Sequence, residues 1–184
     1  MVCAMAIPAF AVKGTEPADI TGHSFNAYQI FTATVTEKTE DQGKVSNVNW
    51  GTGVDKDTLL AALKADTTFD GAFNAAKTAA DVVQAMSGWS ATSEKTAAFA
   101  KVVADHLTTT CISTTSSSIR FDAAGYYLIV DTTDVSGKDD ALNLTLLNVA
   151  EAGSVKVKTK VVKPTVDKFV WDNDDGAGKG TTGD

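Results

Sequence analysis

An alternating stretch near the end of the chain, residues 155–171, constrains the fold more than any other feature. Its first half alternates small apolar side chains with lysines, so that each kind would lie on one face of a strand. This alternation is typical of a half-buried strand. The two faces would hold Val155, Val157, Thr159 and Val161 on one side, and Lys156, Lys158 and Lys160 on the other. Pro164 ends this strand because proline has no N–H for the sheet ladder. A second alternating run, residues 165–171, begins directly after it. This pattern predicts the end of one β domain and the start of another.

The charge of the chain excludes nucleic acid as a partner. The 184 residues carry a net charge of −7 and contain a single arginine, Arg120. Nucleic-acid binding needs clustered cations that neutralise phosphates. Five lysines lie in residues 156–168, but they alternate with valines and lack the aromatic side chains on which bases stack. A hydrophobic content of 43% is enough for a buried core, and the length allows one domain and part of another.

The first eleven residues are interpreted as the remnant of a secretion signal. They are apolar and end in Ala9-Phe10-Ala11, which is typical of a signal-peptide cleavage site. The segment is too short to span a bilayer, and the sequence predicts no membrane span. The alternative is a buried core strand. Removal of the segment would leave Cys111 as the remaining cysteine, so we expect no disulfide and no metal site.

Alternating β patterns recur along the rest of the chain. The longest predicted strand covers residues 22–36 and places one set of side chains on a common face. That face would contain Phe25, Ala27, Gln29, Phe31, Ala33 and Val35. Further strands are predicted at residues 45–50, 118–121, 126–131 and 141–149. Gly51-Thr52-Gly53 is predicted to be a turn, because it is too short for a phosphate-binding loop.

A helical block lies between these strands. Helices are predicted at residues 55–64 and 78–87 and after Ser93, with apolar residues at helical spacing that would cover a sheet. His106, near the end of the third helix, is interpreted as a packed or helix-capping residue. Residues 108–118 are rich in serine and threonine. They form either a flexible or glycosylated loop, or an edge strand or connector.

Several segments of the chain resemble the motifs of one protein family, and they occur in the same order along the sequence. Residues 22–31 read G-H-S-F-N-A-Y-Q-I-F, residues 124–131 read A-G-Y-Y-L-I-V-D, and residues 164–168 read P-T-V-D-K. These segments resemble the N-terminal domain of Gram-positive, sortase-assembled backbone (major) pilins, in the isopeptide-forming fimbrial protein family. The resemblance implies a mainly β fold with inserted helices, an Ig-like β-sandwich, over residues 12–163. It also implies that residues 164–184 begin a following Ig-like, isopeptide-forming domain.

The resemblance assigns roles to two lysines. Lys160 aligns with the lysine that a pilin-type sortase joins to the neighbouring pilin subunit, although Thr159 stands where the family has proline. Lys158 and Lys156 are the alternatives, and all three could instead form only a solvated strand face. Lys168 aligns with the lysine that forms an isopeptide bond with a later asparagine beyond residue 184. Read from the strand pattern alone, Lys168 is either buried with Val166 and Val170 or exposed to water.

The implied function is structural. The chain would be a subunit of a secreted, cell-wall-anchored pilus, and it would supply an amine to the sortase rather than act as an enzyme. We find no catalytic constellation and predict no cofactor and no metal. The glycine-rich residues 176–181 and the acidic residues 172–176 lack the spacing of nucleotide and calcium sites. The alternative function is a surface adhesin or tip pilin that binds a host or glycan ligand, which would not need an accessible acceptor lysine.

Overall fold

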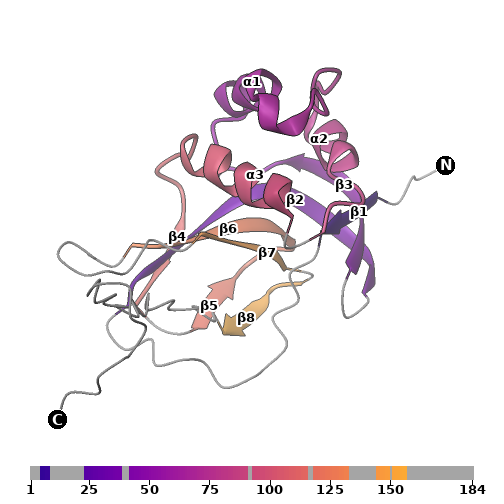
Figure 1. The fold of residues 1–184 in the computed structure, drawn as a ribbon. Coiled ribbons are helices and arrows are strands. Elements are labelled where there is room, and N and C mark those ends of the chain that lie inside the picture. Colours follow the sequence, from indigo (N-terminus) through magenta and orange to yellow (C-terminus); the bar gives the residue numbers. More distant parts are fainter. Residues whose placement is uncertain are drawn as a thin grey trace, which may run out of the picture.

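The computed structural model describes residues 5–8, 23–38, 42–90, 93–115, 118–132, 144–149 and 151–156 (Figure 1). The strands are β1 (Met5–Pro8), β2 (Phe25–Lys38), β3 (Gln42–Trp50), β4 (Ile112–Thr114), β5 (Ser118–Phe121), β6 (Gly125–Asp131), β7 (Leu144–Val149) and β8 (Gly153–Lys156). The helices are α1 (Lys56–Ala65), the short 3-10 helix η1 (Thr67–Phe69), α2 (Ala79–Ala85) and α3 (Glu94–Ala104). The protein is therefore mainly β, with its helices inserted between β3 and β4.

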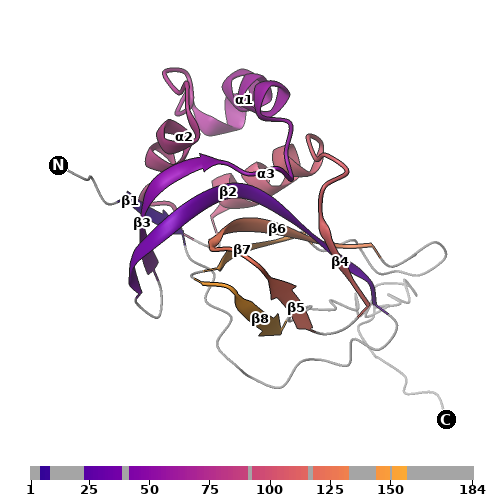
Figure 2. The same ribbon diagram turned by 180° about the vertical axis from the view of Figure 1, so that it is seen from behind.

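The elements form three layers. The central layer is an antiparallel sheet in the order β1-β3-β2-β6-β7, and β4 pairs with β2 beside it. The helices cover one face of this sheet, and a two-stranded antiparallel sheet of β5 and β8 lies on the other (Figures 1 and 2). Two packed antiparallel sheets are compatible with a β-sandwich, and the helices do cover a sheet, as the sequence predicts.

Local hydrogen bonds set the starts of the helices. The Asp55 carboxylate accepts hydrogen bonds from the backbone N–H groups of Asp57 and Thr58, each at 3.2 Å. Thr78 and Asp81 form a capping box at α2, and the Ser93 hydroxyl accepts from the N–H of Thr96 at α3. Such side chains pair N–H groups that have no partner inside the helix. The three predicted helices are confirmed.

The larger core lies between the helices and the central sheet. Its buried members are Ile30, Phe31, Val45, Val54, Leu59, Leu63, Phe69, Phe73, Ala76, Ala79, Val82, Val83, Met86, Phe99, Ala100, Val103, Tyr126, Leu128 and Leu146. Phe31 lies at its centre, with ring centroids 6.4 Å from Phe99 and 6.2 Å from Tyr126. We call this group the helix-side core.

A smaller core lies between the central sheet and the β5–β8 sheet. Its buried members are Phe25, Ala27, Ile119, Phe121, Tyr127, Ile129, Leu147 and Val149. We call this group the ribbon-side core. Strand β6 contributes alternate residues to both cores, because successive side chains of a strand point to opposite faces. Burial on both faces explains why residues 126–130 are apolar without a break.

A β-bulge in β2 overturns one predicted face. Against β6, Gln29 lies opposite Tyr127 and Phe31 lies opposite Tyr126, so Ile30 is an extra residue between them. Phe25 therefore belongs to the ribbon-side core, whereas Phe31 belongs to the helix-side core. The prediction that Phe25 and Phe31 share a face is wrong, because the extra residue of a bulge reverses the alternation beyond it.

Glycines pack directly against the backbone of this bulge. The N–H of Gly51 donates to the carbonyl of Ile30 at 2.8 Å, and the N–H of Gly53 donates to the carbonyl of Gln29 at 3.0 Å. A Cβ atom at Gly51 would lie 2.2 Å from the Gln29 carbonyl oxygen, and one at Gly53 would lie 2.5 Å from the Gln29 nitrogen. The predicted turn at residues 51–53 is present. It forms hydrogen bonds with the middle of β2, between the residues that pair with β4 and those that pair with β3.

Two segments with alternative interpretations contain strands. Residues 5–8 form β1, which pairs with β3 so that Met5 lies opposite Val45. This agrees with the strand alternative for the first eleven residues, and the secretion signal stays a prediction. In the segment 108–118, residues 112–114 form β4 and pair with residues 25–27 of β2. This part is a short strand beside β2, as one alternative predicts.

Candidate functional site

The structure describes the first residues of the predicted strand that carries the candidate lysines. Strand β8 pairs with β5, with Val155 opposite Ile119 and Lys156 opposite Ser118. The strand predicted from residue 155 is therefore present at residues 155 and 156. The predicted acceptor Lys160, its alternative Lys158, the isopeptide lysine Lys168 and the predicted domain boundary after residue 163 lie outside the described residues.

Strand β8 lies on the face of the central sheet opposite to the helices (Figures 1 and 2). Its partner β5 is held there by Ile119 and Phe121, which are fully buried in the ribbon-side core. Residues 151–154, which lead into and begin β8, are exposed. The segment that continues to the lysines thus follows a strand whose partner is anchored in the core.

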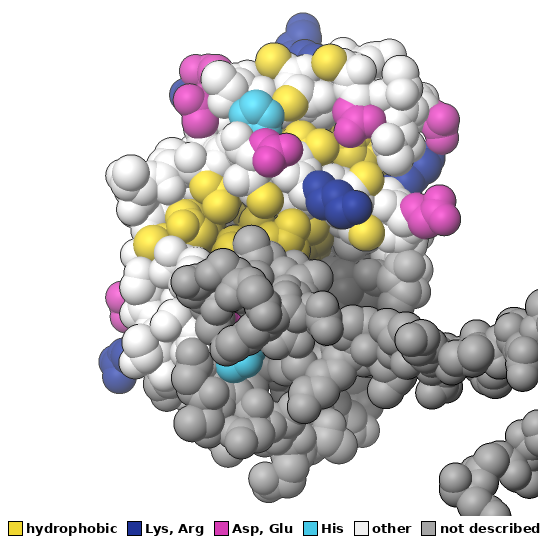
Figure 3. Space-filling model, turned by 60° about the vertical axis from the view of Figure 1, so that its left-hand side comes forward, with side chains coloured by type: hydrophobic (Ala, Val, Ile, Leu, Met, Phe, Trp, Pro, Cys, Tyr) yellow, Lys and Arg dark blue, Asp and Glu magenta, His cyan; other side chains and the backbone are white. Residues whose placement is uncertain are grey.

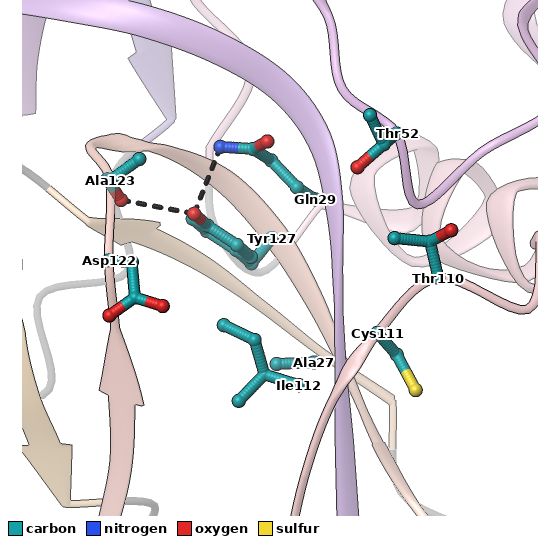
Figure 4. Close-up of a pocket in the computed structure, with 9 residues that line it drawn as sticks. All are labelled: Ala27, Gln29, Thr52, Thr110, Cys111, Ile112, Asp122, Ala123 and Tyr127. Carbon is teal, nitrogen blue, oxygen red and sulfur yellow. Dashed lines mark hydrogen bonds between the residues drawn. The ribbon is translucent and has the colours of Figure 1, made fainter.

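A pocket of about 190 Å³ lies beside β4 on the same side of the central sheet (Figure 4). It lies between the β4 region and the turn that joins β5 to β6. Its lining residues are Ala27, Gln29, Thr52, Thr110, Cys111, Ile112, Asp122, Ala123 and Tyr127. Sequence reasoning missed this pocket, because its residues come from four separate segments and share no motif.

Gln29 and Tyr127 form the polar centre of the pocket. The Tyr127 hydroxyl donates to the carbonyl of Ala123 at 3.0 Å and accepts from Gln29 Nε2 at 2.9 Å. Burial raises the pKa of Tyr127, which keeps its phenol protonated and able to donate. Figure 4 shows the Gln29 amide nitrogen directed at Tyr127 and the amide oxygen directed away from it. The hydroxyl therefore fixes which end of the amide is presented to the pocket.

Cys111 lies at the margin of this pocket as a partly exposed free thiol. Its Sγ lies 3.5 Å from the hydroxyl of Ser113, and that hydroxyl donates to Asn26 Oδ1 at 2.8 Å. The sulfur points away from Gln29 and Tyr127 in Figure 4. Cys111 thus contributes to the wall of the pocket, and its sulfur does not join the polar centre.

The two histidines lie in separate environments. His106 follows α3, and its Nδ1 lies 3.2 Å from the Thr58 hydroxyl while its carbonyl accepts from the N–H of Asp55. Of the packed and helix-capping roles expected for His106, this arrangement agrees with the packed one. His23 Nδ1 lies 2.6 Å from a carboxylate oxygen of the buried Asp131, a pairing that the sequence did not predict. Within the described ranges, no group of three or more His, Cys, Asp and Glu could hold a metal ion.

On the face shown in Figure 3, hydrophobic side chains form a band among separate acidic and basic residues. The partly buried hydrophobic residues that pack against the helix-side core include Leu60, Ala98, Val102, Leu107, Val130 and Leu144. No helix among the described residues is long and apolar enough to cross a membrane. Comparison with protein-family models, characterised proteins and solved structures gives no match.

Proposed function

We propose that this chain is the N-terminal domain of a backbone pilin, a structural subunit of a covalently polymerised surface pilus. A pilin-type sortase would carry a threonyl acyl group from a neighbouring subunit's sorting signal to the amine of Lys160. The protein would be secreted, anchored to the cell wall, and a substrate rather than an enzyme. The Ig-like pilin fold of residues 12–163 and the following domain from residue 164 are part of this proposal.

The position of β8 is the observation that best supports the proposal. An acceptor lysine must be reached by both an enzyme and a second subunit, so it needs an exposed and well-anchored segment. Residues 151–154 are exposed, and β8 pairs with a strand whose Ile119 and Phe121 are buried. The family resemblance along residues 22–168 and the mainly β architecture support the same function.

A cross-link map tests this function. The chain would be incubated with a pilin-type sortase and a sorting-signal peptide, and the adduct would be located by tandem mass spectrometry. We expect an adduct at Lys160 that is lost in Lys160→Ala. Lys163→Ala is the matched control, because it removes a nearby lysine that is not a candidate acceptor.

Other outcomes have defined meanings. An adduct at Lys156 or Lys158 would keep the function and correct the alignment of the motif. The absence of any adduct, with a sortase shown to be active on its own pilin, would contradict the shaft role and favour the adhesin or tip pilin. For Lys168, a longer chain that contains the next domain should lose one ammonia in its intact mass, and Lys168→Ala should prevent that loss.

A further inference from the structure

We propose that the pocket beside β4 binds one neutral sugar ring, such as a pyranose at the end of a glycan. This function is separate from the joining of subunits and does not depend on Lys160. The argument rests on the size of the pocket, the distribution of its polar groups, its charge and the way in which Gln29 is held.

The size of the pocket matches one ring. Its volume is about 190 Å³, and a cavity of about 150 Å³ accommodates benzene. A six-membered ring with small substituents therefore fits, whereas two linked rings do not. The pocket opens to solvent at Thr52, Thr110 and Asp122, which are all exposed, so the rest of a glycan could extend outward.

The polar groups stand around an apolar floor. The partly exposed Ile112 supplies apolar surface, and the buried Ala27 and Tyr127 close the base of the pocket. Around it lie the Gln29 amide and the Thr52 hydroxyl, whereas the Thr110 hydroxyl points away from Gln29 and Tyr127 (Figure 4). A pyranose has the complementary form, with C–H groups on its faces and hydroxyls around its rim. Each hydroxyl can both donate and accept, so amide and hydroxyl partners suit it.

The charge of the lining selects against an anion. Among the described residues that line the pocket, Asp122 carries a charge and none is Lys, Arg or His. Its side chain is 88% exposed, and the guanidinium of Arg120 lies 3.9 Å from it. A carboxylate accepts hydrogen bonds from sugar hydroxyls but repels a carboxylate or phosphate. The ligand is therefore a neutral sugar rather than an acidic one.

Gln29 is fixed before any ligand arrives. Its amide nitrogen donates to Tyr127, and its backbone is held by the glycines of residues 51–53. Its amide oxygen has no hydrogen-bond partner within the described residues, nor do the hydroxyls of Thr52 and Thr110. Groups that are already oriented lose little conformational entropy on binding. The Gln29 amide oxygen and the Thr52 hydroxyl are the groups that we expect to contact sugar hydroxyls.

Two-dimensional NMR of the isotope-labelled chain tests the proposal. The probes are the methyl glycosides of glucose, galactose, mannose and N-acetylglucosamine, with sialic acid as the anionic comparison. At least one neutral glycoside should shift the backbone amide signals of Gln29, Thr110 and Ala123. These chemical shift changes should saturate at millimolar glycoside concentrations. Thr110→Phe places a ring in the mouth of the pocket and should weaken binding at least tenfold. Thr109→Phe is the matched control, because Thr109 is exposed but does not line the pocket, and it should bind as the parent does.

A second variant guards against misfolding of Thr110→Phe. Asp122→Asn keeps the shape of an exposed side chain and removes its charge, so it should reduce the exclusion of sialic acid without adding bulk to the pocket. The proposal is overturned if no neutral glycoside gives saturable shifts, or if the shifts map away from the pocket. Equal weakening by Thr110→Phe and Thr109→Phe, or tighter binding of sialic acid by the parent, would also overturn it.

Discussion

The two faces of the central sheet are covered in different ways. The helix-side core contains most of the fully buried large side chains, including Phe31, Phe73 and Phe99. Among the described residues, the ribbon-side core has eight buried members beside the two strands β5 and β8, and an open pocket lies at its margin. The pocket and β8 are both found on this second face.

This difference separates stability from function within one sheet. A close-packed aromatic core holds the strands in register. A two-stranded sheet buries less surface and leaves polar groups such as Gln29 accessible at its edge. We therefore expect changes on the helix side to act mainly on the free energy of unfolding, and changes on the ribbon side to act on binding and linkage as well.

The largest expected effect compares one phenylalanine from each core. Both Phe99 and Phe121 are fully buried, and Phe-to-Ala changes in cores cost about 3–5 kcal/mol. The loss of stability for Phe99→Ala should lie at the upper end of this range, because Phe31 and Phe73 around it are held by other packed elements. Phe121→Ala should lie at the lower end, because β5 can move inward beside the open pocket. Urea denaturation followed by circular dichroism measures both, and an equal or larger loss for Phe121→Ala would contradict the comparison.

The next effect compares two glycines. Gly53→Ala should cost about 1–3 kcal/mol, because its Cβ would lie 2.5 Å from the Gln29 nitrogen and the bulge would have to shift. Gly153→Ala in β8 is the control, since a Cβ there would meet no atom of the described residues within 4 Å. Thermal unfolding of the two variants gives the difference. If Gly53→Ala is as stable as Gly153→Ala, the turn does not fix the bulge.

The bulge also shows where sequence reasoning reaches its limit. The helix starts at Asp55, Thr78 and Ser93 depend on side chains within a few residues, so their local pattern was enough to predict them. Residues 22–36 were predicted as one regular strand, but the sheet inserts Ile30 as an extra residue before Phe31. That insertion depends on partners in β6, which are distant in sequence.

The two candidate sites also differ in how far the sequence alone could predict them. Alternation with lysines marked residue 155 as a strand residue, and the pairing of β8 with β5 agrees with it. The pocket needs Gln29, Thr110 and Tyr127 to meet, and residues so far apart come together only through the topology of the sheet. A polar residue such as Gln29 among apolar neighbours was the one local signal, and it did not reveal its partner.

A smaller effect concerns the acidic caps of the helical layer. Backbone hydrogen bonds from Lys77 and hydrogen bonds from Thr78 hold the pKa of Asp81 below its ordinary value, and similar bonds from Thr58 lower that of Asp55. A lowered folded-state pKa favours folding above the unfolded value of about 3.9, and this contribution is lost as the pH falls through the folded value. Thr78→Ala should cost about 1 kcal/mol at neutral pH.

Hydrogen exchange can assign this acid sensitivity to one layer. As the pH falls below about 4, protection in α1 and α2 should decrease before that of β6. Asp81→Asn should reduce the pH dependence in α2, while Asp122→Asn serves as a control on the ribbon side, outside any helix. A simultaneous loss of protection in all elements would show that the caps do not act locally.

The smallest effect compares neighbouring tyrosines on opposite faces. The Tyr126 hydroxyl is buried in the helix-side core without a hydrogen-bond partner among the described residues, and burial raises its pKa. Tyr126→Phe should therefore be neutral or stabilise the fold by up to about 1 kcal/mol, because it removes an unpaired polar group. The Tyr127 hydroxyl has two partners, so Tyr127→Phe should destabilise by about 1 kcal/mol. Parallel urea denaturation of both variants measures the two changes in the free energy of unfolding. Changes of the same sign would contradict the expected difference between the two tyrosine hydroxyls.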